Sequence, residues 1–575
     1  MWRMWESTVC GDMAWHRAMA ALEPHNEVAQ ALEEGADRVL SRGAPSLAAE
    51  WLERSADLSE DQSRRARRLL RAAELAFELG RASAVRELTA QARALPLDQV
   101  DFARLAGLEG AFDDGVPGDV DHVRRLVQAA ERARGEGEEG LAAQLLVGAS
   151  MTCYWGGAEE TVRSLVRNAA SKLRLPDVDP RAIVLRAVID PYRDGAELMD
   201  HLLWWAERDT PDPAVSAALG RAGFAVGDFD RALLFARRAS DTFRQQGRVA
   251  LLAQTLVLET YSALYLGRWD VTQVASAEAH RFGVETEQPV WAACAQLGQA
   301  NLAGLQGRRL EAEELASSIE RIAALNGNRS LLNAVQLTRG LAALGDEAPE
   351  DAFTQFARMM DSSDPAYQTP QSGWALDQFA DAAALTGRVE EARAVLREFE
   401  VLTADATAPG VRRAVALARL HLEDDAGLDA RFREARTFAA SASPWYRGRL
   451  DLALGSWLRR HRRIAESRDV LRSAQAVFDA LGAAAWTARA ERELRAAGQR
   501  PQHTDRDGWL KLSAQELQIA QLAAEGLSNR EIGGRLYLSH RTVGSHLYRI
   551  YPKLGIRTRA QLHSALGSDR VPVTV

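Results

Sequence analysis

The residues whose types and spacing point most clearly to a chemical role lie between positions 539 and 549. Arg541, Ser545 and Tyr548 are spaced by four and three residues, so on an α-helix they would share one face. An apolar stripe with similar spacing lies on the opposite side: Val543, Leu547, Ile550 and Leu554. A face of cation, hydroxyl and phenol groups without a carboxylate suits insertion into the major groove of DNA. The alternative interpretation is the solvated face of an ordinary helix pair.

The distribution of charge also indicates a polyanion-binding surface. The 575 residues carry a net charge of -8, yet residues 509–575 hold nine Lys and Arg against four Asp and Glu. No acidic residue occurs between positions 532 and 568, whereas six cations do: Arg535, Arg541, Arg549, Lys553, Arg557 and Arg559. A basic module attached to an acidic body is the electrostatic footprint of nucleic-acid binding. We expect about five phosphate contacts, and hence a slope of roughly -4 to -5 in log affinity against log salt.

Helix-start signals place this face within a set of four short helices between positions 512 and 566. Ser513–Glu516, Ser528–Glu531 and Thr558–Gln561 have the spacing of capping boxes, and Ser539 is a simple hydroxyl cap. Each signal predicts the first turn of a helix.

The two central helices have the lengths of a helix-turn-helix. They are predicted at 528–536 and from 540 to about 551, joined by a three-residue turn. Gly533 is expected where the two helices approach closely, because it has no side chain. Pro552 is expected to end or kink the second helix.

Residues 25–497 read almost throughout as amphipathic helices separated by short turns. Apolar residues recur at i, i+3 and i+4, and strand signals are nearly absent. Glycines at intervals of about 40 residues mark the expected turns: Gly43, Gly80, Gly118, Gly157, Gly195, Gly227, Gly267, Gly307, Gly345, Gly387 and Gly427. This pattern predicts a tetratricopeptide-like α-solenoid, a continuous right-handed superhelix in which each helix pair packs only on its neighbours.

The predicted fold class is all-α, a helical-hairpin solenoid followed by a four-helix helix-turn-helix domain. The expected segments are an N-terminal segment at 1–24, the solenoid at 25–497, a linker at 498–508, the basic module at 509–567 and a tail at 568–575. The linker is distinguished by polar residues, two glycines and a proline.

Five tryptophans of the predicted solenoid, Trp51, Trp204, Trp205, Trp291 and Trp374, are interpreted as packing between helices rather than as a ligand cage. The curved inner surface of such a solenoid usually binds a protein, a peptide or a small ligand. We therefore expect a protein or small-ligand partner on the body.

The sequence contains no catalytic or metal-binding constellation that we recognise. Three widely spaced cysteines exclude a disulfide framework, and no HExxH, CxxC or GxSxG motif occurs. The GxGxxG match from Gly135 to Gly140 follows no strand and is predicted to be a loop. Lys172, Lys511 and Lys553 all lack the preceding glycine of a P-loop. We expect no enzyme activity, no cofactor and no metal.

The location of the protein is predicted from what the sequence lacks. No stretch approaches 18 consecutive apolar residues, and the first residues lack the pattern of a signal peptide. We expect a cytoplasmic protein without membrane association.

The stretch from Leu512 to Ile550, LSAQELQIAQLAAEGLSNREIGGRLYLSHRTVGSHLYRI, resembles the DNA-binding domain of LuxR-type transcriptional regulators. The resemblance implies that the third helix reads the major groove and that the fourth, Thr558 to Leu566, supports dimerisation on two half-sites. It implies base-facing roles for Gly544, Ser545 and Tyr548, phosphate-facing roles for Ser539, Arg541, Thr542 and Arg549, and dimer contacts by Ala560, Gln561, His563 and Ser564. Gly544 has no side chain that could read a base, and Pro552 is expected to shorten the reading helix. We therefore expect few direct contacts between side chains and bases.

The body resembles the helical repeats of the large ATP-binding LuxR-family regulators related to the maltose activator. The similarity rests on Ala14-Trp-His-Arg-Ala and on Arg42-Gly-Ala-Pro-Ser-Leu-Ala-Ala-Glu-Trp-Leu-Glu-Arg-Ser-Ala. In those proteins a nucleotide-switch ATPase precedes the repeats, and this chain is expected to begin after that domain.

Together these features predict a sequence-specific, DNA-binding transcriptional regulator whose body acts as a sensor or partner-binding platform. The expected partners are double-stranded DNA, a second copy of the chain on DNA, a protein or small ligand on the solenoid, and RNA polymerase as a candidate. The alternative is an interaction scaffold whose basic module no longer binds DNA.

Overall fold

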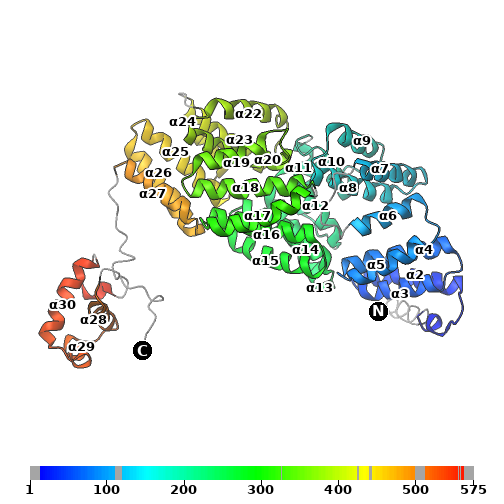
Figure 1. The fold of residues 1–575 in the computed structure, drawn as a ribbon, viewed down its shortest axis with the longest axis horizontal. Helices are drawn as coiled ribbons and strands as arrows, with labels where there is room; N and C mark the ends of the chain where they lie inside the picture. Colours follow the sequence, from blue (N-terminus) through cyan, green and yellow to red (C-terminus); the bar gives the residue numbers. More distant parts are fainter. Residues whose placement is uncertain are drawn as a thin grey trace. The chain divides into compact units, whose positions relative to one another are not determined.

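The chain is all-helical over the residues that its computed structural model describes (Figure 1). These residues are 13, 15–110, 120–193, 195–210, 212–325, 327–423, 427–439, 443–498, 512–554, 556 and 558–562. They form two compact units, Met1–Glu493 and Leu494–Val575. No helix in the described ranges is long and apolar enough to cross a membrane. The predicted all-α class is confirmed.

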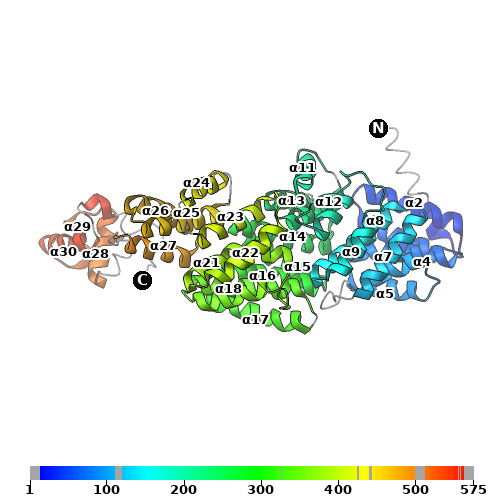
Figure 2. The ribbon, with the colours of Figure 1, turned by 90° about the horizontal axis from the view of Figure 1, so that it is seen from above.

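The first unit, which we call the body, is a continuous series of helices (Figures 1 and 2). Its first part consists of α2 (Asn26–Ser41), α3 (Pro45–Asp57), α4 (Gln62–Glu78), α5 (Ala82–Arg93), α6 (Gln99–Gly110), α7 (Val120–Gly135), α8 (Glu139–Gly156), α9 (Glu160–Ala170), α10 (Pro180–Ile189), α11 (Gly195–Ala206), α12 (Pro213–Val226), α13 (Phe229–Gln246), α14 (Val249–Tyr265) and α15 (Trp269–Glu285). Its second part consists of α16 (Pro289–Leu305), α17 (Arg309–Leu325), α18 (Arg329–Gly345), α19 (Pro349–Met360), α20 (Thr369–Trp374), α21 (Leu376–Thr386), α22 (Val389–Leu402), α23 (Pro409–Leu422), α24 (Leu428–Ala439), α25 (Pro444–Arg460), α26 (Ile464–Leu481) and α27 (Ala484–Ala496).

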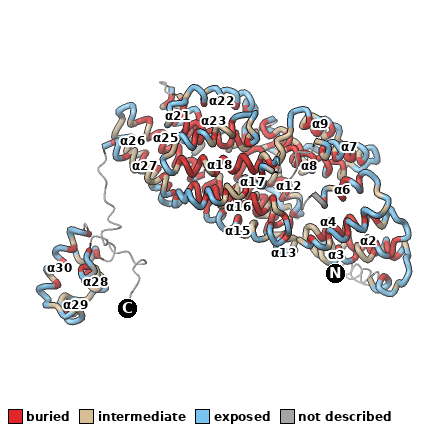
Figure 3. The backbone as a smooth tube through the Cα atoms, in the orientation of Figure 1, coloured by how far each residue is buried: buried red, intermediate tan, exposed pale blue. Residues whose placement is uncertain are grey.

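Most helices of the body pack against the next helix in the chain, as helical hairpins do. Several also pack against the helix after that, such as α14 on α16 and α16 on α18. Most residues of α16 and α18 are buried, whereas α22 keeps a largely exposed outer face (Figure 3). This stacking of hairpins is the predicted tetratricopeptide-like arrangement.

The predicted glycine turns are only partly correct. Those in the left-handed backbone region, where glycine is favoured, are Gly43, Gly80, Gly157, Gly227, Gly267, Gly307 and Gly387. Gly195 instead begins α11, Gly345 ends α18 and Gly427 lies in the turn before α24, while Gly118 lies outside the described residues. The GxGxxG match falls between α7 and α8, so it is a loop, as predicted.

The expectation that each helix pair packs only on its neighbours is wrong. Helix α8 packs on α18 and α4 on α14, although each pair is separated by more than a hundred residues of sequence. The Gly410 amide donates a 2.9 Å hydrogen bond to the Gly227 carbonyl, and a Cβ on Gly410 would lie 2.6 Å from that oxygen. Helices far apart in the sequence therefore contact each other within the solenoid. The spacing of apolar residues within one helix pair does not reveal such contacts.

Buried ion pairs join helices near the end of the body. Asp381 on α21 accepts two hydrogen bonds of 2.7 Å from the Arg489 guanidinium on α27. His421 on α23 lies 3.6 Å from the same carboxylate, and the neighbouring Asp377 pairs with Arg449 on α25. Burial raises the pKa of Asp381, but Arg489, His421 and Arg449 together outweigh burial and hold that pKa below its usual value. Removing one charge of such a buried pair would leave its partner uncompensated and would destabilise the body.

The tryptophan interpretation is correct for Trp51, which is 4% exposed and stacks on Trp15. It fails for Trp204, which is 37% exposed beneath the Arg208 guanidinium. Trp291 and Trp374 contribute to the wall of a cavity, described below.

Candidate nucleic-acid interface

Three helices of the second unit form the predicted helix-turn-helix module: α28 (Ala514–Ala524), α29 (Asn529–Leu536) and α30 (His540–Lys553). They are followed by a 3₁₀ turn, η2 (Arg559–Gln561). Their shared core includes the predicted stripe of α30, namely Val543, Leu547, Ile550 and Leu554. The apolar pattern of α30 therefore predicted its buried side correctly.

The helix starts are capped as predicted. The Glu516 amide donates to the Ser513 hydroxyl at 3.3 Å, while the Glu516 carboxylate accepts from the Ser513 amide at 2.9 Å. Ser528 and Glu531 form the same reciprocal pair at the start of α29. Ser539 caps α30 by accepting from the Thr542 amide at 3.1 Å. These bonds satisfy amides that would otherwise lack helical partners.

The turn between α29 and α30 fixes the position of the proposed reading helix. Tyr537 adopts a left-handed backbone with φ of 54°, and the Leu538 amide donates to the Gly533 carbonyl at 2.9 Å. A Cβ on Gly533 would lie 2.5 Å from the Leu538 carbonyl oxygen, closer than real Cβ atoms come. The need for glycine at 533 was predicted, but its close neighbour is the carbonyl oxygen of the turn residue Leu538. The left-handed Tyr537 was not predicted.

The side of α30 opposite the core is exposed. Arg541, Ser545 and Tyr548 are all exposed, and Tyr548 retains 80% of its accessible surface. Thr542 and Arg549 flank them and are also exposed. This groove-facing surface, as we call these five residues, has hydrogen-bonding and cationic groups but no carboxylate.

Hydrogen bonds within α30 and its cap hold side chains that were predicted to face phosphate. The Ser539 and Thr542 hydroxyls lie 2.7 Å apart and hydrogen-bond to each other, so their orientation is fixed. Arg549 donates from Nε to the Ser545 carbonyl at 3.4 Å.

Gly544 is partly buried, and a Cβ there would lie 3.5 Å from the Asn529 side chain. A larger residue at 544 would therefore meet α29.

Two cations of the acid-free stretch are already paired within the module. Lys553 Nζ lies 2.6 Å from Glu516 Oε2 and 2.8 Å from Oε1. Arg559 donates to Asn529 Oδ1 at 2.8 Å and to the Leu527 carbonyl. Arg557 lies outside the described residues. The local charge pattern did not reveal these partners, and the number of phosphate contacts stays a prediction.

The end of α30 differs slightly from the expectation. The helix includes Pro552 and ends one residue later, at Lys553. Proline is tolerated in this last turn because it removes only one hydrogen bond near a helix end. The expected termination near residue 551 was two residues too early.

The predicted fourth helix is described only at its start. The Thr558 amide donates to Gln561 Oε1 at 3.0 Å, and Leu562 is buried in the module core. Gln561 is exposed and Ala560 lies in the 3₁₀ turn, whereas His563 and Ser564 lie outside the described residues. The dimerisation role of these four residues stays a prediction.

We predict that replacing Lys553 by methionine lowers the stability of the module without changing the salt dependence of DNA binding. The Lys553 ammonium, together with the Ser513 amide, holds the pKa of Glu516 at about 2, below its usual 4.5. A lowered carboxyl pKa stabilises the fold above about pH 4.5, and this stabilisation is lost as the pH falls toward 2. Because Lys553 is partly exposed, we expect a loss of about 0.5–1 kcal/mol at neutral pH.

The measurement is hydrogen exchange of module peptides at neutral and acidic pH, together with duplex affinity over a salt series. Arg549→Met is the matched control, because it should reduce the salt slope by about 0.9 without affecting stability. If Lys553→Met reduces the slope instead, Lys553 contacts phosphate and its pairing with Glu516 is not maintained on DNA.

Comparisons with known proteins identify the same segment. Residues 510–565 match the model of a family described as bacterial regulatory proteins, luxR family. Over 55 residues the chain is 47% identical to a putative HTH-type transcriptional regulator of Mycobacterium bovis, which is 10% of this chain and 6% of that protein. Over 52 residues it is 48% identical to the probable HTH-type transcriptional regulator GfsR of Streptomyces halstedii, 9% of this chain and 21% of that protein. The chain thus matches only a small part of these relatives' length.

The likeness of the helical chain to a solved structure is weak. Yeast Tom70 aligns over 82% of this chain and 96% of its own, with 11% identity and a TM-score of 0.25. The hairpin architecture of the body is shown by its own helix contacts.

Proposed function

We propose that this chain, which carries a LuxR-family helix-turn-helix domain over residues 510–565, is a sequence-specific DNA-binding transcriptional regulator. In this proposal α30 enters the major groove of double-stranded DNA, and the body acts as a sensor or partner-binding platform in the cytoplasm. A second copy of the chain occupies a second half-site, and RNA polymerase is a candidate partner.

The observation that carries the proposal is the groove-facing surface of α30. Its residues are exposed on the side opposite a fully buried apolar stripe. The capping bonds of Ser539 and the turn at Gly533 fix the start of this helix, so its exposed side chains have a defined direction. A rigid, acid-free helix face fits a groove lined by phosphates.

The residues are proposed to divide between two roles. Tyr548, Ser545 and the Gly544 backbone would face base edges, while Ser539, Arg541, Thr542 and Arg549 would approach phosphates. The exposure of Tyr548 and Arg549 on adjacent sides of the helix supports this division. Ala560, Gln561, His563 and Ser564 are proposed to contact a second copy on DNA.

A genome-wide binding profile of the tagged chain, alongside Arg549→Met and Tyr548→Ala, tests the proposal. We expect discrete binding sites that share a sequence motif. Arg549→Met should weaken occupancy at all sites alike, because phosphate contacts carry no sequence information, whereas Tyr548→Ala should change the motif.

Two outcomes would count against this function. A profile without enriched sites would favour an interaction scaffold that does not bind DNA. Identical profiles for the two variants would show that the division between base-facing and phosphate-facing residues is wrong.

A further inference from the structure

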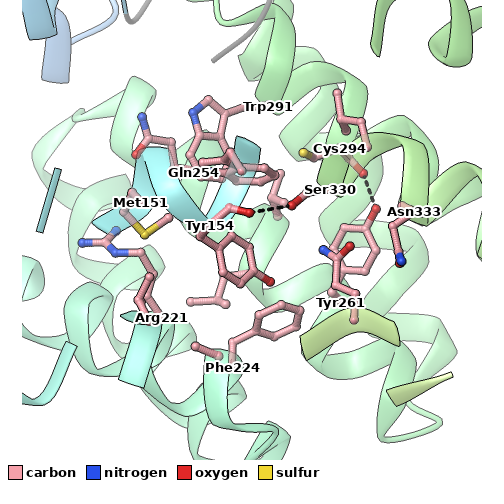
Figure 4. A pocket seen from close by; sticks show the side chains of 18 of the residues that line it. Met151, Tyr154, Arg221, Phe224, Gln254, Tyr261, Trp291, Cys294, Ser330 and Asn333 are labelled. Carbon is pink, nitrogen blue, oxygen red and sulfur yellow. Dashed lines mark hydrogen bonds between the residues drawn. The ribbon is translucent and has the colours of Figure 1, made fainter. Parts of the chain in front are cut away.

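The body contains a cavity of about 90 Å³. It is lined by residues of α8, α10, α12, α14, α16, α18 and α20, and Figure 4 shows side chains from its wall. Small-molecule sites combine mostly apolar walls with a few precisely placed polar groups. The wall here is mainly apolar and aromatic, with Tyr154, Phe224, Tyr261 and Trp291 around its centre.

One positive charge lies in this wall. Arg221 on α12 is partly buried and forms no hydrogen bond or ion pair with any residue in the described part of the chain. The residues that line the cavity, all of them described, include no Asp, Glu, Lys or His. Burial lowers the pKa of the Arg221 guanidinium. A desolvated cation without a counter-charge is costly, so the protein gains stability when an anion binds beside it.

Polar atoms without hydrogen-bond partners lie elsewhere in the same wall. The side-chain oxygen of Asn333 on α18 and that of Gln371 on α20 are buried without a donor. The Tyr154 hydroxyl lies near Gln371 but forms no well-aligned hydrogen bond with it. Buried polar groups in native proteins are normally satisfied, so two unused acceptors in a cavity indicate a ligand that donates a hydrogen bond.

The two kinds of polar group are separated. Arg221 lies with Met151 and Gln254 on one side of the cavity, and Asn333 lies with Ser330 and Cys294 on the other (Figure 4). Aromatic side chains line the space between these sides. A complementary ligand therefore carries an anion at one end, an apolar ring in the middle and a hydrogen-bond donor at the other end.

We propose that this cavity binds a small aromatic monocarboxylate whose ring system carries an N–H or O–H donor. The carboxylate pairs with Arg221, the ring packs among Tyr154, Phe224 and Trp291, and the donor reaches Asn333 or Gln371. A single cation in the described lining favours one negative charge over a phosphate or a dicarboxylate. The site belongs to the body, so its occupancy does not depend on whether the module binds DNA.

Calorimetric titration of the full chain with indole-3-acetate tests the proposal, because this probe combines a carboxylate, an apolar ring and an N–H. Indole-3-acetamide is the neutral control, and inorganic phosphate and succinate test the other anions. We expect saturable binding of one indole-3-acetate per chain, and at least about tenfold weaker binding of the amide, phosphate and succinate.

Arg221→Met should abolish the preference for the carboxylate over the amide. Arg268→Met is the matched control, since Arg268 is exposed and lies outside the cavity, and it should leave the preference unchanged. Thermal unfolding checks the fold, because Arg221→Met removes an unpaired charge and should not lower the melting temperature. Ala217→Trp, which fills the cavity, should block both probes.

Equal affinity for the acid and the amide would overturn the proposal, as would a preference that survives in Arg221→Met. Absence of saturable binding, or binding of several probe molecules per chain, would overturn it as well. Stronger binding of phosphate would show that the cation serves a different class of anion.

Discussion

Gly533→Val is expected to unfold the helix-turn-helix module and abolish duplex binding while leaving the body folded. The first atom of any side chain at 533 would lie 2.5 Å from the Leu538 carbonyl oxygen and 3.5 Å from the His540 amide nitrogen. Backbone atoms in a tight turn cannot move aside as a flexible side chain can. We expect a loss of about 3 kcal/mol, which is a large share of the stability of so small a domain.

Gly534→Val is the matched control for this prediction. It introduces the same side chain one residue later on α29, at a position where a Cβ would meet no atom within 4 Å. Hydrogen exchange of peptides from residues 512–554, with body peptides as the internal reference, measures the effect. Equal protection in the two variants would show that the close approach at Gly533 does not hold the module together.

Asp381→Asn is expected to destabilise the body by about 3–5 kcal/mol, because it leaves Arg489 as a buried cation without a counter-charge. Both hydrogen bonds between these side chains measure 2.7 Å, and the carboxylate of Asp381 is only 4% exposed. Denaturant unfolding followed by circular dichroism, with hydrogen exchange of α21 and α27 peptides, measures the loss.

An exposed ion pair provides the comparison for Asp381. Asp469 and Arg472 lie 2.8 Å apart on α26 with most of their side chains in solvent, so Asp469→Asn should cost less than about 0.5 kcal/mol. Adding Arg489→Met to Asp381→Asn should restore part of the stability, because the unpaired charge is then removed. A loss that persists unchanged in the double variant would assign the effect to packing rather than to charge.

The sequence was most informative where local chemistry alone determines structure. The capping boxes at Ser513 and Ser528, the buried stripe of α30 and the need for glycine at 533 all depend on residues within one or two helical turns. Periodicity likewise predicted the helical hairpins of the body. These features could be predicted because each is satisfied by neighbours in the chain.

Features that depend on distant residues were missed. Lys553 was counted as a free cation, although it pairs with Glu516, 37 residues earlier. The bond between Gly227 and Gly410, the Asp381–Arg489 pair and the cavity beside Arg221 each require helices far apart in sequence to meet. Trp291 was interpreted as packing between helices, because the sequence does not indicate that its ring lines an open space.

The central claim, that α30 binds duplex DNA through an acid-free face, is tested most directly by measuring duplex affinity of the purified chain over a salt series. Four described arginines of the module are exposed and free of internal ion pairs: Arg530, Arg535, Arg541 and Arg549. If each of these arginines contacts one phosphate, log affinity against log salt has a slope of about -3 to -4 per protomer. Arg541→Met removes one contact and should make this slope shallower by about 1. An affinity that does not depend on salt, or no binding to any duplex, would contradict the claim.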